Sequence, residues 1–260
     1  MQAFIGKKRK RFSCNSEIKH LFNSDSENFP LLCNRKNIAF PVMLKKVKIS
    51  VLMAVYNTEF AFIKRAIDSV LNQDFQDFEL IIIDDGGTND SRAQMLQYAE
   101  QHEDKIIYVR HSNRGQSKSI DRGVLNSIGE FITILDSDDE YKPHHLSSCL
   151  EKIESLDLIA SFTETMVNDS SDYFVPDKDD HTQLVHLDDC ILFGTLFGRR
   201  EVFTSICLKS GYAADADFFE QAEAKFRVEK VDLRSYIYYR NMPNSISATV
   251  KKNNAPLSNS

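Results

Sequence analysis

The sequence predicts an α/β fold in which helices flank a mainly parallel sheet. Three strand-and-helix pairs follow one another from residue 48 onward and are joined by short connections. Their strands are almost wholly apolar, as expected for strands that are buried on both faces. The predicted strands at 49–55, 78–83 and 131–135 each end in polar or acidic residues, which is typical of the ligand-binding edge of such a sheet.

Composition narrows the class of protein. The chain has 260 residues and a net charge of −6, which gives no general attraction to nucleic acid. Its five cysteines show no CxxC spacing, so we expect a reducing compartment rather than a disulfide framework or a zinc site. No run approaches the ~20 apolar residues that span a bilayer. We therefore expect a cytoplasmic protein, with peripheral contact at the inner face of a membrane.

Three segments differ in pattern along the chain. Residues 1–46 contain a basic run at Lys7–Arg11 and lack a clear period, so we interpret them as a mobile N-terminal arm. A second interpretation is contact with anionic lipid or a partner through that run. Residues 47–247 form a single predicted domain, and residues 248–260 form a polar tail.

The first strand-and-helix pair begins with a strand at Ile49–Val55, which is followed by Tyr56 and Asn57. Asn57 or Thr58 is suited to cap the next helix. That helix is predicted because apolar residues recur at spacings of three and four. These residues are Phe62, Ile63, Ala66, Ile67, Val70 and Leu71.

The second and third pairs repeat this pattern. A strand at Phe78–Ile83 ends in Asp84 and Asp85, and a helix capped by Asp90 or Ser91 follows it. The third strand lies at 106–109 and turns at 113–115 into a helix with an apolar residue at every fourth position. We expect that helix to include Ile128 and to end at Gly129.

Three carboxylates follow the strand at Phe131–Leu135 within four positions, at Asp136, Asp138 and Asp139. Like charges this close repel one another, so a cation is expected to neutralise them. Oxygen ligands at a strand end suit magnesium or manganese, which often share their shell with a diphosphate. The alternative is an acidic turn before a helix that begins near Pro143.

The rest of the chain continues the alternation. Two carboxylates, Asp215 and Asp217, stand at the start of an amphipathic helix, and His144 and His145 are expected to face water at a helix start. The other predicted elements are a helix at 143–155, a strand at 158–162, a loop at 168–180, a strand at 192–197, a helix from 200, and short strands at 228–233 and 236–239.

These motifs, in this order, resemble family 2 glycosyltransferases of the GT-A fold, a nucleotide-diphospho-sugar transferase-like architecture. The resemblance covers about residues 47–247, as one domain after the N-terminal arm. No G-x-G-x-x-G or P-loop is present in the sequence. The matching segments are VLMAVYN (51–57), LNQDFQDFELIIIDDGGTND (71–90), NRGQSKSIDRG (113–123), GEFITILDSDDEYKP (129–143), LFGRREVF (196–203), DADFF (215–219) and YYRNMPNSIS (238–247).

The resemblance implies a metal-dependent, inverting glycosyltransferase. Its donor would be a nucleotide-diphosphate sugar, most often a UDP-sugar, and its acceptor a hydroxyl group of a carbohydrate or lipid-linked molecule. The expected cofactor is Mn²⁺ or Mg²⁺, and the expected pathway is synthesis of surface polysaccharide or lipopolysaccharide. Two other classes compete: a nucleotide-sugar binding protein without transfer, and a glycosidase with paired carboxylates.

Five residues match the nucleoside-binding positions of that family: Val55, Tyr56, Asn57, Asp84 and Asp85. The resemblance implies that Asp85 accepts a hydrogen bond from the uracil N–H. A carboxylate at that edge would reject cytosine, because the corresponding ring nitrogen of cytosine is an acceptor.

The acidic cluster matches the family's metal and ribose positions, with Asp136, Asp138 and Asp139 as metal ligands. Asp138 is also placed at the ribose edge, so it counts among the nucleotide-binding residues. Asp215 matches the general base that takes the proton of the acceptor hydroxyl. By local sequence alone Asp217 fits that position equally well, as a carboxylate at a helix start.

The chain departs from the family pattern at three positions. Ala214 stands where a glutamate often precedes the base, and Asp121 replaces a common asparagine. Met242 stands where a histidine often helps to bind the metal or the diphosphate. These departures are the reason to keep the binding protein without transfer as an alternative.

Overall fold

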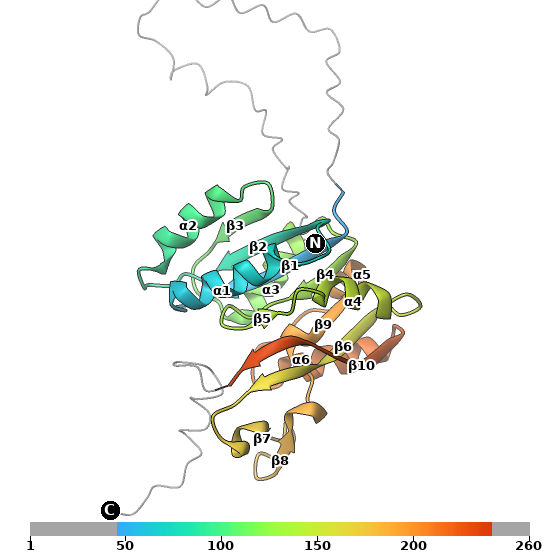
Figure 1. The fold of residues 1–260 in the computed structure, drawn as a ribbon. Helices are drawn as coiled ribbons and strands as arrows, with labels where there is room; N and C mark the ends of the chain where they lie inside the picture. The colour runs from blue at the N-terminus through green and yellow to red at the C-terminus, as the bar shows by residue number, and fades with distance from the viewer. Residues whose placement is uncertain (1–45, 241–260) are drawn as a thin grey trace, which may run out of the picture. The chain divides into compact units, whose positions relative to one another are not determined.

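The structure is a computed structural model, and it describes residues 46–240 (Figure 1). Nearly all of the expected arm, the end of the expected domain with Met242, and the polar tail lie outside the described residues. An eight-stranded sheet runs through the described part in the order β3-β2-β1-β4-β9-β6-β10-β5. In residues 46–240, no helix has the length and apolar character needed to cross a membrane.

The amino-terminal half of the sheet is parallel, as predicted. β1 (Ile49–Val55) lies between β2 (Phe78–Asp84) and β4 (Phe131–Ile134), and β3 (Ile106–Arg110) pairs with β2. β1, β2 and β3 are each followed by a helix, and such connections between parallel strands of one sheet are right-handed as a rule. The expected mainly parallel sheet flanked by helices is confirmed.

The carboxy-terminal half makes the sheet mixed. β9 (Leu196–Arg199) is antiparallel to both β4 and β6 (Leu158–Met166), and β10 (Val228–Tyr239) is parallel to β6. The edge strand β5 (Glu140–Tyr141) pairs with β10 in antiparallel fashion. The two short strands expected at 228–233 and 236–239 are one strand with an irregular register between its halves.

Helices cover both faces of the sheet and enclose two apolar layers. In β1, Val51 and Met53 face one layer and Leu52 faces the other, as the alternation of side chains along a strand requires. The first layer contains α1 (Phe60–Leu71), α2 (Ser91–Gln101) and α4 (His145–Lys152). The second contains α3 (Gln116–Asn126), α5 (Arg200–Ser205) and α6 (Ala214–Glu223).

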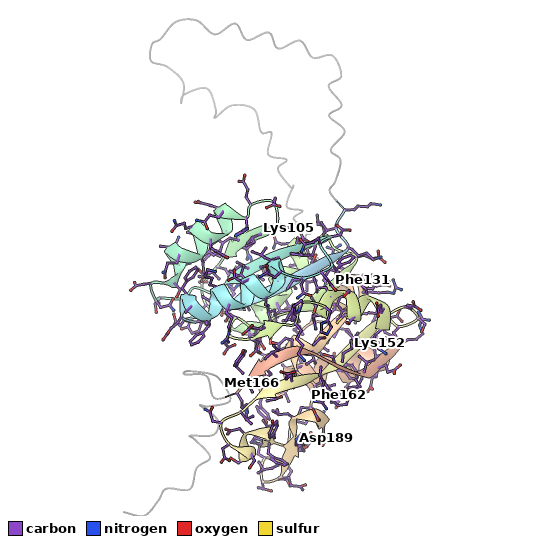
Figure 2. The ribbon with its side chains drawn as sticks, viewed as in Figure 1. Lys105, Phe131, Lys152, Phe162, Met166 and Asp189 are labelled. Carbon is purple, nitrogen blue, oxygen red and sulfur yellow. The ribbon has the colours of Figure 1, made fainter. Side chains whose placement is uncertain are left out.

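The segment between β6 and β9 contains more regular structure than expected. The loop predicted at 168–180 contains the 3₁₀ helix η1 (Ser170–Tyr173), which is closed by a capping box from Asp169. It also contains β7 (Phe174–Pro176), which forms a hairpin with β8 (Leu184–His186). Figure 2 shows Met166 and Asp189 beside this hairpin.

Two further 3₁₀ helices complete that segment. They are η2 (Leu187–Asp189) and η3 (Phe193–Thr195). The strand predicted at 192–197 is therefore η3 followed by β9.

Helix α3 ends before its predicted end because buried side chains bind the backbone that follows it. It ends at Asn126, and Ile128 is exposed rather than part of an apolar face. Glu79 Oε1 accepts a hydrogen bond from the Ile128 N–H at 2.8 Å, and Ser50 Oγ accepts one from the Gly129 N–H at 2.9 Å. These bonds draw the chain out of the helix and into β4.

His145 is buried, which corrects the expectation that it faces water. Its ring stacks on Tyr141 with the ring centres 3.9 Å apart, and its Nδ1 lies 2.8 Å from Ser235 Oγ. Burial lowers the pKa of His145 to about 3, so the ring is neutral near pH 7. Its neighbour His144 is exposed, as expected.

Candidate active site

The carboxyl ends of β1, β2 and β4 meet at one edge of the sheet. Val55 and Asp84 are register partners, and the Asp85 N–H donates to the Val55 carbonyl at 2.9 Å. On the other side of β1, the Leu135 N–H donates to the Leu52 carbonyl at 2.9 Å. The polar residues that follow these strands therefore lie along a single edge, as the sequence predicts.

The loop after β1 is tied to the loop after β2. Asn57 has a left-handed backbone with φ of 54°, and its Oδ1 accepts a hydrogen bond from the Thr88 N–H at 2.7 Å. The Thr58 carbonyl accepts one from Ser91 Oγ at 2.8 Å. Neither Asn57 nor Thr58 caps α1, whose N-cap is Glu59. Tyr56 is left 52% exposed at the same edge, where its ring is free to contact a ligand.

Asp84 is buried and fully engaged by the protein itself. One carboxylate oxygen accepts from the Gly86 N–H at 2.9 Å and the Gly87 N–H at 3.1 Å. The other accepts from the Tyr108 hydroxyl and from Arg110 Nε, the latter at 3.0 Å. These four donors use the lone pairs of the carboxylate, so the expected direct contact with a nucleotide is revised. Asp84 instead shapes the loop after β2.

Asp85 has spare capacity to accept hydrogen bonds. Its two oxygens accept from the Arg114 N–H at 2.7 Å and the Gly115 N–H at 2.9 Å, one each. His111 Nδ1 lies 3.4 Å from the first oxygen. Each oxygen can accept a further hydrogen bond, and the backbone donors fix the direction in which it does so.

Asp136 occupies an electrostatically unfavourable position. Its pKa is raised from the ordinary value of 3.8 to about 7, chiefly by burial and then by the charges of Asp138 and Asp215. Gln116 opposes this rise, because its Nε2 donates to Asp136 Oδ1 at 2.7 Å. The influence of Asp215 shows that the start of α6 faces the acidic turn.

The other two carboxylates of the turn differ in their contacts. Burial raises the pKa of Asp138, and the charge of Arg65 opposes that rise. Asp139 is 1% exposed, and its two oxygens accept from the Tyr236 hydroxyl at 2.7 Å and the Tyr239 N–H at 2.8 Å. Asp139 thus anchors the turn to β10, and this contact set differs from that of an open metal ligand.

Asp215 and Asp217 are separated by their environments. Burial raises the pKa of Asp215 to about 6, although the backbone N–H groups of Ala216 and Phe193 oppose the rise. The Ala216 N–H lies 2.9 Å from Asp215 Oδ1. Asp217 is 37% exposed and pairs with Lys209 at 3.2 Å. A buried carboxylate with a raised pKa is the better proton acceptor near neutral pH.

A divalent cation fits the Asp136 and Asp138 side of this site. Burial raises the pKa of both carboxylates, and the charge of Asp138 raises that of Asp136 further, so a cation would remove a cost. Within residues 46–240 no three acidic, histidine or cysteine side chains converge as a ligand set. The triad of Asp136, Asp138 and Asp139 stays a prediction, and burial together with the charges of Asp136 and Asp138 raises the pKa of Asp139. Two carboxylates with diphosphate and water would complete the shell.

The sequence analysis did not identify three residues that support the site. Gln116 hydrogen-bonds Asp136, and Tyr236 and Tyr239 hold Asp139 across about a hundred residues of chain. Gln116 directly follows the Asn113–Gly115 turn, so its position at the sheet edge could have marked it. The tyrosines carry no such signal, because their role depends on the pairing of β10 with β5.

Solved structures define the class of fold. The chain superposes on S. aureus TarS in complex with UDP-GlcNAc with a TM-score of 0.60, at 20% identity over 76% of this chain and 60% of that one. It superposes equally well, with a TM-score of 0.60, on the mannosyltransferase PcManGT from Pyrobaculum calidifontis, at 15% identity over 79% of this chain and 60% of that one. The fold is that of GT-A glycosyltransferases.

Sequence comparison then gives the family. Residues 50–204 match the model of glycosyl transferase family 2, and the chain belongs to that family. An uncharacterized glycosyltransferase of Nostoc sp. is 36% identical over 126 residues, which is 48% of this chain and 39% of that protein.

A second relative has a more specific name. The GalNAc(5)-diNAcBac-PP-undecaprenol beta-1,3-glucosyltransferase of Campylobacter jejuni is 34% identical over 107 residues, which is 40% of this chain and 34% of that protein. In both relatives the matched region spans well under two thirds of the whole length.

Proposed function

We propose that this protein is an inverting glycosyltransferase that moves a sugar from a UDP-sugar to an acceptor hydroxyl group. The observation that carries the proposal is the proximity of Asp215 to the acidic turn, where its charge raises the pKa of Asp136. It joins the acidic turn at the end of β4 to a carboxylate about eighty residues later in the chain. In an inverting transfer the acidic turn would hold the donor diphosphate on one side of the anomeric carbon. Asp215 would meet the acceptor hydroxyl on the other side.

The donor nucleoside would lie at the ends of β1 and β2. Val55, Tyr56 and Asn57 form one side, where the Tyr56 ring is exposed. Asp85 would accept from the uracil N–H, because its oxygens retain lone pairs that the backbone has already oriented. UDP-GlcNAc bound to TarS supports a uridine donor, whereas PcManGT was solved with GDP-Man. We favour uridine because Asp85 suits its imide edge.

Asp136 and Asp138 would hold Mn²⁺ or Mg²⁺ together with the donor diphosphate. The mannosyltransferase neighbour was solved with Mn²⁺, which supports this assignment. The bound ion would neutralise the negative charge that grows on the leaving diphosphate. Asp138 would also contact the ribose. We assign Asp139 to positioning of the turn, because Tyr236 and Tyr239 tie its oxygens to β10. Each oxygen keeps a further lone pair, as in Asp85, so Asp139 would also be able to face the ion.

Asp215 would act as the general base. Its carboxylate takes the proton of the acceptor hydroxyl while that oxygen forms a bond to the anomeric carbon. The bond from the anomeric carbon to the diphosphate oxygen breaks, and its electron pair leaves with the nucleoside diphosphate. Attack from the face opposite the leaving group inverts the configuration. The pKa near 6 keeps Asp215 mostly ionised at pH 7 and still basic enough to accept the proton.

The test compares Asp215→Asn with Asp217→Asn. UDP release is measured with a panel of UDP-sugars, GDP-mannose and sugar acceptors in the presence of Mn²⁺. We expect Asp215→Asn to lower the rate by about 10²–10⁴-fold, the usual contribution of a general base. Asp217→Asn should keep the rate within about threefold, because an exposed pair of this kind contributes little. Full turnover by Asp215→Asn would remove the assignment.

The same assay separates the alternatives. Metal-dependent UDP binding without transfer to any acceptor would favour a nucleotide-sugar binding protein. Ala214 is one of the reasons for that alternative hypothesis. Ala214 is buried in the apolar layer under α6, so a packing role already accounts for the small residue there. Cleavage of a glycoside without a nucleotide donor would favour a glycosidase.

The acceptor is proposed to be a carbohydrate or a lipid-linked carbohydrate of a surface polysaccharide or lipopolysaccharide. The name of the Campylobacter jejuni relative includes an undecaprenol-linked saccharide, which supports this class for a related sequence. A lipid-linked acceptor would require contact with the inner face of a membrane. Flotation of the protein with vesicles that carry such an acceptor tests that contact.

A further inference from the structure

Arg65 of α1 contacts the acidic turn directly. Its Nη2 donates a hydrogen bond to the backbone carbonyl of Asp138. Its guanidinium carbon lies 3.8 Å from the centre of the Tyr239 ring, within the range of a cation–π contact. The side chain is 29% exposed, so it is largely enclosed by these partners.

Glu140 completes a cluster around this arginine. Arg65 Nε lies 3.0 Å from Glu140 Oε1, which is close enough for an ion pair, although its N–H does not point at an acceptor. The same Glu140 oxygen accepts from the Tyr239 hydroxyl at 2.7 Å. Tyr239 in turn donates its N–H to Asp139. We refer to Arg65, Glu140 and Tyr239 as the arginine clamp.

The clamp holds the turn at the residues that matter most for the proposed chemistry. Across the turn the Asp139 N–H donates to the Asp136 carbonyl at 3.2 Å, and Ser137 Oγ lies 2.7 Å from Thr58 Oγ1. The first contact holds the N–H of the peptide between Asp138 and Asp139. Arg65 holds the carbonyl of that same peptide, so the orientation of the peptide that follows Asp138 depends on both bonds.

We propose that Arg65 is a positioning residue that orients the Asp138 carboxylate toward the donor diphosphate. The proposal rests on the proposed function, since it assigns Asp138 to the donor and its metal ion. Arg65 touches the backbone of Asp138 and not the donor. Residues that orient metal ligands from outside the ligand shell typically alter metal affinity by about 10–100-fold when they are lost.

A hollow beside the clamp makes a direct rescue experiment feasible. It has a volume of about 470 Å³, lies between α1 and β5, and opens next to Arg65. Truncation of Arg65 would extend this hollow to the Asp138 carbonyl. A guanidinium ion from solution is small enough to enter it and carries the same donors as the lost side chain.

The experiment uses the full chain with Arg65→Ala, Arg65→Lys and the control Lys64→Ala. Lys64 lines the same hollow but pairs with Asp68 and does not contact the turn. Mn²⁺ binding in the presence of UDP is measured by electron paramagnetic resonance, and KM and kcat are measured for the UDP-sugar.

For Arg65→Ala we expect about 10–100-fold weaker Mn²⁺ binding and a comparable fall in kcat/KM. Arg65→Lys should restore part of the loss, because lysine keeps a donor and a charge. Guanidinium at millimolar concentration should restore part of the Arg65→Ala loss and leave Lys64→Ala unchanged.

The outcomes separate this inference from the proposed function. Wild-type protein that binds no Mn²⁺ with UDP would overturn the proposed function itself. If the wild-type protein binds Mn²⁺ and UDP, and the Arg65→Ala protein binds Mn²⁺ with equal affinity, only the role of Arg65 is overturned. A loss that neither lysine nor guanidinium restores, together with a lower unfolding temperature, would assign Arg65 a purely structural role and also overturn the inference.

Discussion

Asp215 and Asp217 stand two positions apart, yet the fold gives their carboxylates different chemistry. Asp215 is half-buried beside the acidic turn with a pKa near 6, whereas Asp217 pairs with Lys209. Asp136 and Asp139 differ too, because Asp136 is half-buried whereas Asp139 is buried and held by Tyr236 and Tyr239. At the scale of single residues, burial and hydrogen-bond partners decide which of several identical side chains carries a function.

Asp136→Asn should stabilise the metal-free protein at alkaline pH. The pKa of Asp136 is about 7 in the folded protein against an ordinary 3.8, so the folded state binds the proton more tightly. The contribution of this proton to the free energy of unfolding is fully present below about pH 4 and is lost as the pH rises through 7. We expect a gain of up to about 4 kcal/mol at pH 8 in chelator, since the shift is about three pKa units and one unit is worth about 1.4 kcal/mol.

Urea unfolding at pH 5 and pH 8 measures this effect, with Asp179→Asn as the control at an exposed carboxylate. The gain should be smaller at pH 5 and should approach zero only below about pH 4, where Asp136 is protonated in both the folded and the unfolded state. An Asp136→Asn protein that is less stable than wild type at pH 8 would contradict the described environment of this residue.

At the scale of elements, η3 and β10 support the acidic turn together. A Cβ atom at Gly194 of η3 would lie 2.2 Å from the Tyr236 hydroxyl oxygen, well inside van der Waals contact. That hydroxyl donates to Asp139, and it also accepts from the Asp136 N–H at 3.3 Å. Glycine at this position therefore allows a tyrosine of β10 to reach the turn after β4.

Gly194→Ala should displace Tyr236 and weaken both stability and metal binding. The ring is buried and cannot move away without a shift of β10, so we expect a loss of about 1–3 kcal/mol, as is usual for overpacking. Urea unfolding and Mn²⁺ titration with UDP measure the two effects.

Tyr236→Phe is the matched comparison for this variant. It removes the hydroxyl group but keeps the ring, and should weaken metal binding with a smaller loss of stability. Wild-type behaviour of Gly194→Ala would show that η3 does not constrain the turn.

At the scale of the whole molecule, the donor site belongs to no single element. The residues proposed for it follow β1, β2 and β4, and the proposed base Asp215 lies on α6. A ligand that contacts several of these segments holds them together, so its binding free energy adds to the stability of the folded domain.

UDP with Mn²⁺ should therefore raise the unfolding temperature by about 5–10 °C. At a hundred times its dissociation constant a ligand adds about 2.7 kcal/mol, and about 2–4 °C per kcal/mol is usual for a domain of this size. CDP with Mn²⁺ should give a smaller shift, because cytosine lacks the ring N–H from which Asp85 would accept a hydrogen bond. Thermal scans with UDP and chelator complete the comparison. Equal shifts for UDP and CDP would contradict the role of Asp85.

The sequence by itself determined the parallel half of the fold and the edge at which the site lies. Apolar runs such as Phe78–Ile83 and the acidic residues that follow them are local patterns, and local patterns report strands and their ends. The same reasoning missed the β7–β8 hairpin and the early end of α3. Their causes, a capping box at Asp169 and the buried pair Ser50 and Glu79, act through contacts that no periodicity reveals.

Only the tertiary structure decided the roles inside the site. Asp84, Asp85, Asp136, Asp138 and Asp139 are alike in the sequence, but four protein donors occupy Asp84 and two tyrosines hold Asp139. Asp215 is distinguished from Asp217 by burial near Asp136. The physical reason is that a carboxylate's availability depends on its desolvation and its partners, and both are set by residues far away along the chain.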